Sequence, residues 1–189
     1  MIELKQPDKN LLEQVKKGAK EIKEFPSPFD ILVVKRFFQA WADDFKTYFE
    51  EIENERKDID LPEGFVPQTV FWLFDNDVFV GFFALRHEMN EKMMKTGAGH
   101  IAYEIIPSMR RKGYGTAGLR LVLDYARDVL GLKDVVVCCF NDNRASYKTM
   151  SGVMTEYGGY EMEKIQVGDV LKKRCLIELK ARKSRVEEV

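Results

Sequence analysis

The chain has 189 residues, and its 30 lysines and arginines nearly balance its 31 aspartates and glutamates. This balance argues against nucleic acid as the main partner, because nucleic-acid-binding proteins carry a basic excess. No apolar run approaches the roughly 18–20 residues that a membrane-spanning helix needs. The length suits one domain with a sizeable core, so we expect a single domain over residues 1–189.

The three cysteines are an odd number, and their positions match no zinc-site spacing. The first residues of the chain lack the apolar stretch of a secretory signal. We therefore expect reduced thiols, no bound metal, no membrane partner and a cytoplasmic location. Cys138 and Cys139 alternate faces within an apolar run, and we interpret both as core residues.

Helices are predicted in the first 60 residues. Asn10 can cap the first helix with Glu13 as its partner, and the pattern ends at Pro26. From residue 29 to residue 52, aromatic and aliphatic residues recur at helical spacing, although residues 31–34 are also compatible with a short strand. Core packing is the favoured interpretation of this aromatic stripe, ahead of a cofactor site.

A hairpin is predicted next. Residues 69–74 and 78–86 form two β-prone runs, and Asp-Asn-Asp at 75–77 joins them. Gly81 inside the second run indicates a bulge or a close approach of another backbone. Residues 88–99 are interpreted as a polar loop.

The most informative stretch combines a strand, a cationic loop and a helix. Residues 100–106 are β-prone, three basic residues stand at 110–112, and a helical pattern follows the glycines and ends at Gly131. Glycines allow close backbone approach, and a helix N-terminus offers unpaired N–H groups to an anion. The stretch is typical of a phosphate-binding site.

The rest of the chain is predicted as a buried strand, a helix that Asn143 can cap, a strand pair and a loose charged tail. These span residues 135–140, 144–154, 160–167, 171–179 and 181–189.

A nicotinamide-binding oxidoreductase is one alternative, because Gly113, Gly115 and Gly118 match G-x-G-x-x-G. Six residues, 107–112, separate the strand from the first glycine, whereas the dinucleotide motif places them almost directly together. The acidic residue expected at the end of the next strand is also missing, since Asp134 precedes that strand. We therefore rank this alternative low.

The motif [Arg/Gln]-x-x-Gly-x-[Gly/Ala] is met by Arg110, Gly113 and Gly115, and here the sequence resembles the GNAT superfamily of acyl-CoA N-acyltransferases. The preceding hairpin, the buried strand, the Asn143–Ser146 block and the terminal strand pair agree with that family. LRHEMN, HIAYEIIPSMRRKGYGT and NRASYKTM look like a bacterial subgroup known only as predicted acetyltransferases. The resemblance implies an α/β (α+β) fold, with a mixed, mostly antiparallel sheet flanked by helices. It assigns residues 66–180 to the donor-binding core and residues 1–60 to an N-terminal helical part.

The same resemblance implies acetyl-CoA as the acyl donor, bound where the strands at 100–106 and 135–140 splay apart. The family's donor-binding positions fall on the motif strand, the cationic glycine loop and the start of the later helix. They are Tyr103, Glu104 and Ile105 for the pantetheine arm; Arg110, Arg111, Lys112, Gly113, Tyr114, Gly115 and Thr116 for the phosphates; and Asn143 with Ser146 for the pantetheine amides.

The family's usual proton-transfer residues are absent, because Met150, Cys138 and Gly99 occupy their positions. The substitutes are Glu104, His87, His100 and Tyr147, and for each a purely structural role carries at least equal weight. The expected reaction is direct attack of a small-molecule or peptide amine on the thioester in a ternary complex. A non-catalytic acyl-CoA-binding module is the alternative, and a homodimer is expected at family level.

Overall fold

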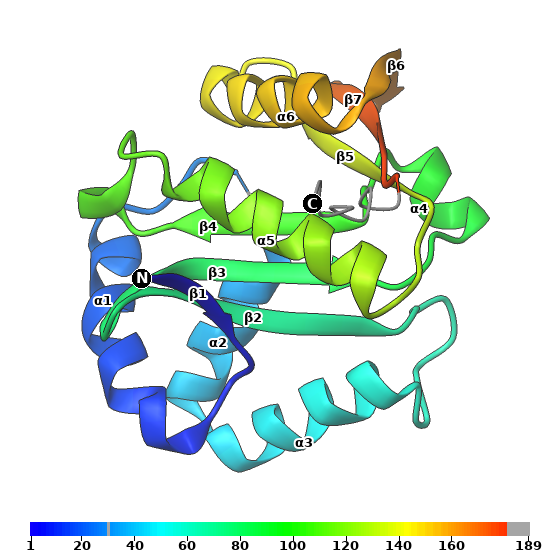
Figure 1. Ribbon diagram of the computed structural model, residues 1–189. Helices are drawn as coiled ribbons and strands as arrows, with labels where there is room; N and C mark the ends of the chain where they lie inside the picture. The colour runs from blue at the N-terminus through cyan, green and yellow to red at the C-terminus, as the bar shows by residue number, and fades with distance from the viewer. Residues whose placement is uncertain (30, 181–189) are drawn as a thin grey trace, which may run out of the picture.

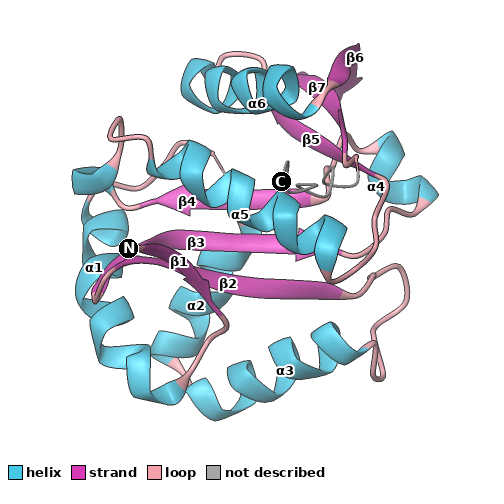
Figure 2. Cartoon of the chain, in the orientation of Figure 1, coloured by secondary structure: helices cyan, strands magenta, loops and turns pink. Residues whose placement is uncertain are grey.

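The computed structural model describes residues 1–29 and 31–180. A mixed sheet in the order β1-β2-β3-β4-β5-β7-β6 runs through the molecule, with helices on both faces (Figures 1 and 2). The strands are β1 (Ile2–Lys5), β2 (Gln68–Asp75), β3 (Val78–Arg86), β4 (Ile101–Ile105), β5 (Asp134–Phe140), β6 (Gly159–Val167) and β7 (Val170–Glu178). The helices are α1 (Leu12–Glu24), α2 (Leu32–Ala42), α3 (Phe45–Lys57), α4 (Glu91–Lys95), α5 (Tyr114–Asp128) and α6 (Arg144–Tyr157), with short 3₁₀ turns at Lys9–Leu11 and Pro107–Met109.

All neighbouring strands are antiparallel except β4 and β5, which are parallel and joined by α5. This confirms the mixed, mostly antiparallel sheet expected from the sequence. None of the helices in the described ranges is both long and apolar enough to cross a membrane. The charged tail predicted at residues 181–189 lies outside the described residues.

The secondary structure differs from the prediction in four places, three of them in the first 60 residues. The strand β1 was not predicted, and residues 31–34 do not form a strand because α2 begins at Leu32. The single helix expected over residues 29–52 is two helices, since the Asp44 carboxylate accepts a hydrogen bond from Lys46 N at 3.0 Å and caps a new helix. Asp8, not Asn10, caps the first turn, and the expected polar loop at 88–99 contains α4.

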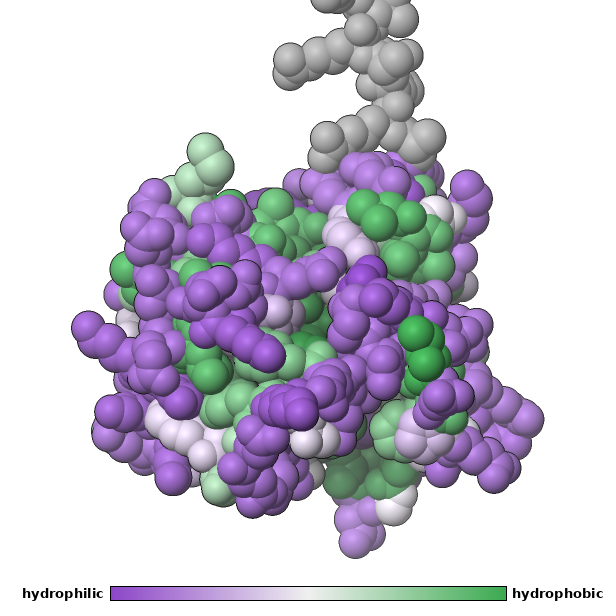
Figure 3. Space-filling model, turned by 90° about the horizontal axis from the view of Figure 1, so that it is seen from below, coloured by the Kyte–Doolittle hydropathy of each residue, from purple (hydrophilic) through white to green (hydrophobic). Residues whose placement is uncertain are grey.

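Two apolar cores lie on opposite faces of the sheet. One packs α5 and α6 against the sheet, and the other packs α1, α2 and α3 against it. In the second core the ring of Phe37 is fully buried and contacts the rings of Trp72 and Phe82, with centroids 6.1 and 4.9 Å away. The aromatic stripe is therefore core packing, as predicted. Seen from the side of α2 and α3, the surface of the molecule is mostly hydrophilic, with smaller apolar patches (Figure 3).

Two glycines stand at positions that a larger residue would not tolerate, one for lack of space and one for its backbone angle. At Gly81 an added Cβ would lie 2.3 Å from Glu104 O, so this glycine permits the close approach of β4 to β3. The register of the hairpin also shifts beside this glycine, because Leu73 pairs with Gly81 and Phe74 with Phe79, which leaves Val80 of β3 as the extra residue of a bulge. Gly131 has φ +69°, and the bond from Leu132 N to Ala126 O at 3.0 Å closes the end of α5 around it.

Candidate donor and acceptor site

The parallel strands β4 and β5 separate soon after they begin. Their ladder has one pair, Ile101 with Val137. Just before it, His100 N donates to Val136 O at 2.7 Å and Val136 N donates to His100 Nδ1 at 3.0 Å. Beyond this clasp the two strands diverge (Figure 1), and we call the diverging region the β4–β5 split.

The backbone of β4 offers hydrogen-bonding groups to this split. At His100 and Ile106, peptide groups bond to β3, and in an antiparallel pair alternate residues do so. Glu104 shares that register and therefore also bonds toward β3. The peptide groups of Tyr103 and Ile105 are directed toward β5, with which they form no ladder pair. Apart from the Ile105 carbonyl, which accepts from Arg110 Nε, they present a strand edge without a ladder partner inside the sheet.

At the open end of the split, the loop before α5 and the first turn of that helix form a cradle of backbone N–H groups. Gly113, with φ +86°, precedes the helix, and Arg111 is also left-handed with φ +62°. The first intrahelical bond runs from Ala117 N to Gly113 O at 3.0 Å, so the N–H groups of residues 114–116 have no partner within the helix. The first turn carries no acidic residue and no side-chain cap. The helix start therefore keeps its partial positive charge for a ligand.

The three basic residues of the loop have different surroundings. Arg110 turns back to β4, where Nη2 lies 2.9 Å from Glu104 Oε1 and Nε donates to Ile105 O at 3.1 Å. Arg111 and Lys112 are exposed beside the cradle. Arg110 thus ties the loop to β4, while the other two cations extend into solvent beside the start of α5.

On the other side of the split, Asn143 caps α6, as predicted, because its Oδ1 accepts from Ser146 N at 3.0 Å. The Ser146 hydroxyl lies 3.1 Å from the Tyr103 hydroxyl, and the Tyr103 ring stacks on Phe83 with centroids 5.2 Å apart. This contact joins β4 to α6 across the split. Tyr103, Asn143 and Ser146, which the sequence assigns to one site, therefore lie in one region of the fold.

Glu104 lies on the opposite face of β4 from Tyr103, toward α1 and α2. Its side chain is 11% exposed. Burial raises the pKa of this carboxyl above its usual 4.5, and the ion pair with Arg110 opposes the rise. A buried carboxylate with an elevated pKa can accept a proton closer to neutral pH than an exposed one.

The other proton-transfer candidates have structural partners. His87 Nε2 lies 2.8 Å from Thr69 Oγ1 on β2, on the far side of β3 from the split, and burial lowers the pKa of His87. Burial likewise lowers the pKa of His100, whose neutral ring clasps β5. The Tyr147 hydroxyl donates to the Glu161 carboxylate on β6. The structure therefore does not bring His87 or Tyr147 to Glu104.

The cysteines lie in the sheet, as predicted. Cys138 Sγ donates to Ala98 O at 3.3 Å, and burial raises the pKa of this thiol to about 12. Cys139 and Met150 are buried in the core beneath α5 and α6. No group of three or more His, Cys, Asp or Glu residues within the described ranges could hold a metal ion.

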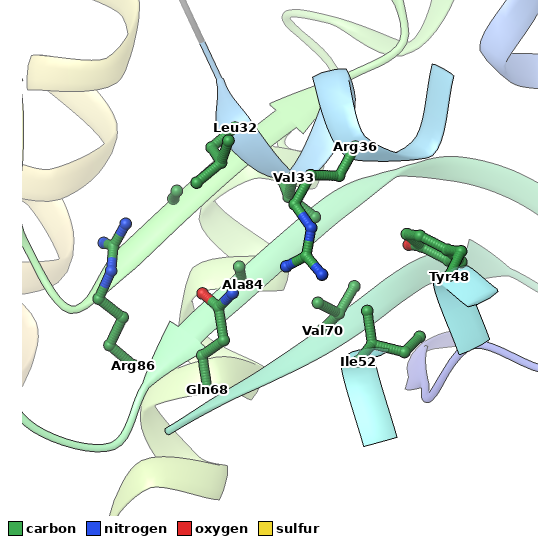
Figure 4. A pocket seen from close by; sticks show the side chains of 10 residues that line it. Leu32, Val33, Arg36, Tyr48, Ile52, Gln68, Val70, Ala84 and Arg86 are labelled. Atoms are coloured by element: carbon green, nitrogen blue, oxygen red, sulfur yellow. The ribbon is translucent and has the colours of Figure 1, made fainter. Parts of the chain in front are cut away.

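Sequence reasoning missed a pocket between α2, α3 and the sheet, on the same face as Glu104. Figure 4 shows Arg36 and Gln68 reaching into it, with Arg86 at one end. Ala84 on β3 and Ala102 on β4 pair with each other and line the pocket beside Arg86. The LRHEMN motif contained Arg86, but only the tertiary structure shows what surrounds it.

A family model described as "Acetyltransferase (GNAT) family" matches residues 34–151. Among similar solved structures, spermidine N-acetyltransferase from Vibrio cholerae in complex with CoA and spermine has a TM-score of 0.58 and 16% identity, covering 94% of this chain and 95% of that one. Mycobacterium smegmatis RimJ in complex with CoA-disulfide has a TM-score of 0.66 and 14% identity, covering 94% and 81%. RimL, a ribosomal L7/L12 alpha-N-protein acetyltransferase in complex with coenzyme A, has a TM-score of 0.64 and 14% identity, covering 95% and 96%. A search of curated protein sequences found no match.

Proposed function

Since the chain belongs to the GNAT acetyltransferase family, we propose that it transfers an acetyl group from acetyl-CoA to a primary amine in a ternary complex. The observation that carries this proposal is the β4–β5 split with the Gly113 cradle at its open end. The pantetheine arm is an extended chain of amides, which suits an unpaired strand edge. The diphosphate suits a helix start that has free N–H groups and no acidic residue.

In this proposal, the peptide groups of Tyr103 and the N–H of Ile105 bind the pantetheine amides, and Asn143 flanks the arm from α6. The N–H groups of residues 114–116 bind the diphosphate, and Arg111 and Lys112 add charge attraction. Glu104 contributes its side chain on the acceptor face instead of its peptide group. Solved structures of the same fold in complex with CoA support CoA as the group that the donor carries.

The donor supplies a thioester whose thiolate is a tolerable leaving group. The amine nitrogen forms a bond to the acetyl carbon, the carbon–sulfur bond breaks, and the amine proton passes to Glu104 directly or through one water. A peptide N–H at the split can stabilise the negative charge on the acetyl oxygen. The departing thiolate takes a proton from solvent, which completes the exchange.

The proposal is tested first by binding. At 100 times its dissociation constant, acetyl-CoA stabilises the folded protein by about 2.7 kcal/mol. For a chain of this size, such stabilisation raises the melting temperature by roughly 5–10 °C. No shift with acetyl-CoA or CoA would refute donor binding, and a shift with NAD(P) alone would favour the oxidoreductase alternative.

Catalysis is tested by thiol release from acetyl-CoA over a panel of polyamines, amino acids and peptides. The variant Glu104→Gln should lose most activity at neutral pH while it retains donor binding, and His87→Ala should retain both. Donor binding without turnover on any amine would favour a non-catalytic acyl-CoA-binding module. The proposed homodimer is tested separately by light scattering after size-exclusion chromatography.

A further inference from the structure

The side chain of Tyr103 lies beside the cradle, on the face of the sheet that α5 and α6 cover. It is half-buried and packs against the core beneath these two helices. An added Cβ at Gly115 in the first turn of α5 would lie 3.6 Å from Tyr103 Cε2 and 3.8 Å from Thr149 Oγ1 on α6. The ring therefore lies next to the helix start that offers its N–H groups, and it extends from β4 toward α6.

The Tyr103 hydroxyl is surrounded by other hydroxyls. It lies 3.1 Å from Ser146 Oγ, and either oxygen can be the donor of that hydrogen bond. Burial raises the pKa of Tyr103 above its usual 10.0, so the phenol stays protonated at neutral pH, and the hydroxyls of Ser146 and Thr149 oppose the rise. They oppose it where they donate to the Tyr103 oxygen, and in that arrangement the Tyr103 O–H is itself available to an acceptor. A hydroxyl that accepts hydrogen bonds is also a stronger donor.

Tyr103 and Glu104 divide the two sides of the proposed reaction between them, because successive side chains of a strand point to opposite faces of the sheet. Glu104 faces the side on which the amine loses its proton. The groups proposed to hold the donor, residues 114–116, Asn143 and Ser146, all belong to α5 and α6. The sulfur of the thioester is joined to that side through the pantetheine arm. The thiolate therefore departs toward the face on which the Tyr103 hydroxyl lies.

We propose that the Tyr103 hydroxyl donates a hydrogen bond to the departing sulfur of acetyl-CoA and stabilises the thiolate as the carbon–sulfur bond breaks. This inference rests on the proposed function and adds a catalytic residue to it. The electron pair of the broken bond stays on the sulfur, Tyr103 keeps its proton, and solvent later protonates the thiolate. A donor that is held toward a developing negative charge lowers the barrier, because its orientation is fixed before the reaction begins.

A binding experiment tests the inference without turnover. Calorimetry compares CoA with desulfo-CoA, which lacks the sulfur, at about pH 7 and about pH 9.5, on either side of a free thiol pKa near 8.5. For the native chain, the affinity for CoA relative to desulfo-CoA should rise by about 10-fold between these pH values, because a hydrogen bond to a charged group favours the thiolate.

The variant Tyr103→Phe removes the hydroxyl and keeps the ring that stacks on Phe83. In this variant the affinity ratio should change by less than about two-fold between the two pH values, since the thiolate has lost its donor. Tyr157→Phe is the matched control on α6, because the Tyr157 hydroxyl lies 3.2 Å from Asp124 Oδ1 at the far end of that helix. It should behave as the native chain does.

With any amine that is acetylated, Tyr103→Phe should lower kcat by about 10- to 100-fold and leave the dissociation constant of acetyl-CoA nearly unchanged. The same pH response in Tyr103→Phe and in the native chain, or an unchanged kcat, would overturn the inference. Equal weakening of CoA and desulfo-CoA by the variant would also overturn it, because a merely structural bridge to α6 has no preference for sulfur. If the native chain binds neither CoA nor desulfo-CoA, the proposed function itself fails and the inference falls with it. If CoA binds and no amine is acetylated, the affinity ratio alone decides.

Discussion

Replacing Arg110 by glutamine should destabilise the protein in a pH-dependent manner. The substitution removes the cation 2.9 Å from Glu104 Oε1 and leaves a carboxylate that is 11% exposed. Breaking a fully buried pair costs about 3–5 kcal/mol, and an exposed pair contributes about 0–1 kcal/mol. Arg110 is 39% exposed. We therefore expect an intermediate loss of about 2 kcal/mol at pH 8.

The sign of the pH effect follows from the direction of the shift. Burial already holds the pKa of Glu104 above its unfolded value, so protonation at low pH favours the folded state and that advantage disappears as pH rises. Without Arg110 the pKa rises further, and the loss at high pH grows. At pH 4 the carboxyl is mostly protonated in both proteins, so the difference should fall below about 1 kcal/mol.

Urea denaturation at the two pH values measures the effect, and a double-mutant cycle with Glu104→Gln isolates it. The coupling free energy should be about 2 kcal/mol at pH 8 and near zero at pH 4. If Glu104 is the base, Arg110→Gln should also move the acidic limb of kcat/KM to higher pH. Equal destabilisation at both pH values, with no coupling, would refute the reasoning.

Gly118→Ala would place a Cβ 2.3 Å from a ring atom of Phe83 and should lower the free energy of unfolding by about 1–3 kcal/mol. Gly152→Ala is the matched control: its Cβ would have no neighbouring atom within 4 Å, and the free energy of unfolding should rise by up to about 1 kcal/mol. Urea denaturation checks both changes. Burial lowers the pKa of His100 below its usual 6.5 in the folded protein, where Nδ1 accepts a hydrogen bond from Val136 N. The free energy of unfolding should therefore decline as pH falls from 6.5 toward the lower pKa of the folded state. His100→Gln should flatten that decline by up to about 1.4 kcal/mol per pH unit, and an unchanged slope would contradict this account. Lys112→Gln should weaken CoA binding a few-fold in calorimetry at low salt, and a difference that persists at about 1 M salt would argue against a screened charge contact.

The central elements could be predicted because their signals are local. The strand, glycine loop and helix around Gly113 follow one another within the chain, and Asn143 caps α6 through a residue three positions away. By contrast, β1 has four residues, and it becomes a strand through its pairing with β2, some 70 residues later. The helical spacing also continues through the break between α2 and α3, so only the Asp44 cap reveals it.

The candidate site could be predicted only in part for the same reason. The donor side depends on a motif whose residues are adjacent in sequence. The pocket between α2, α3 and the sheet depends on ion pairs and hydrogen bonds around Arg36, which involve residues from α3 and β2. Glu104 was singled out from its position on the strand, but its elevated pKa and its face toward α2 required the fold.

The unpaired backbone of β4 has a consequence for association between molecules. A strand edge at the margin of a sheet can recruit a strand from another chain, and many proteins protect such edges with charges or bulges. Here the edge at Tyr103 and Ile105 lies in the interior of the sheet, because β5, β7 and β6 continue beyond it. Its position shields it from foreign strands, and it can remain open for a ligand without making the protein prone to aggregate through that edge.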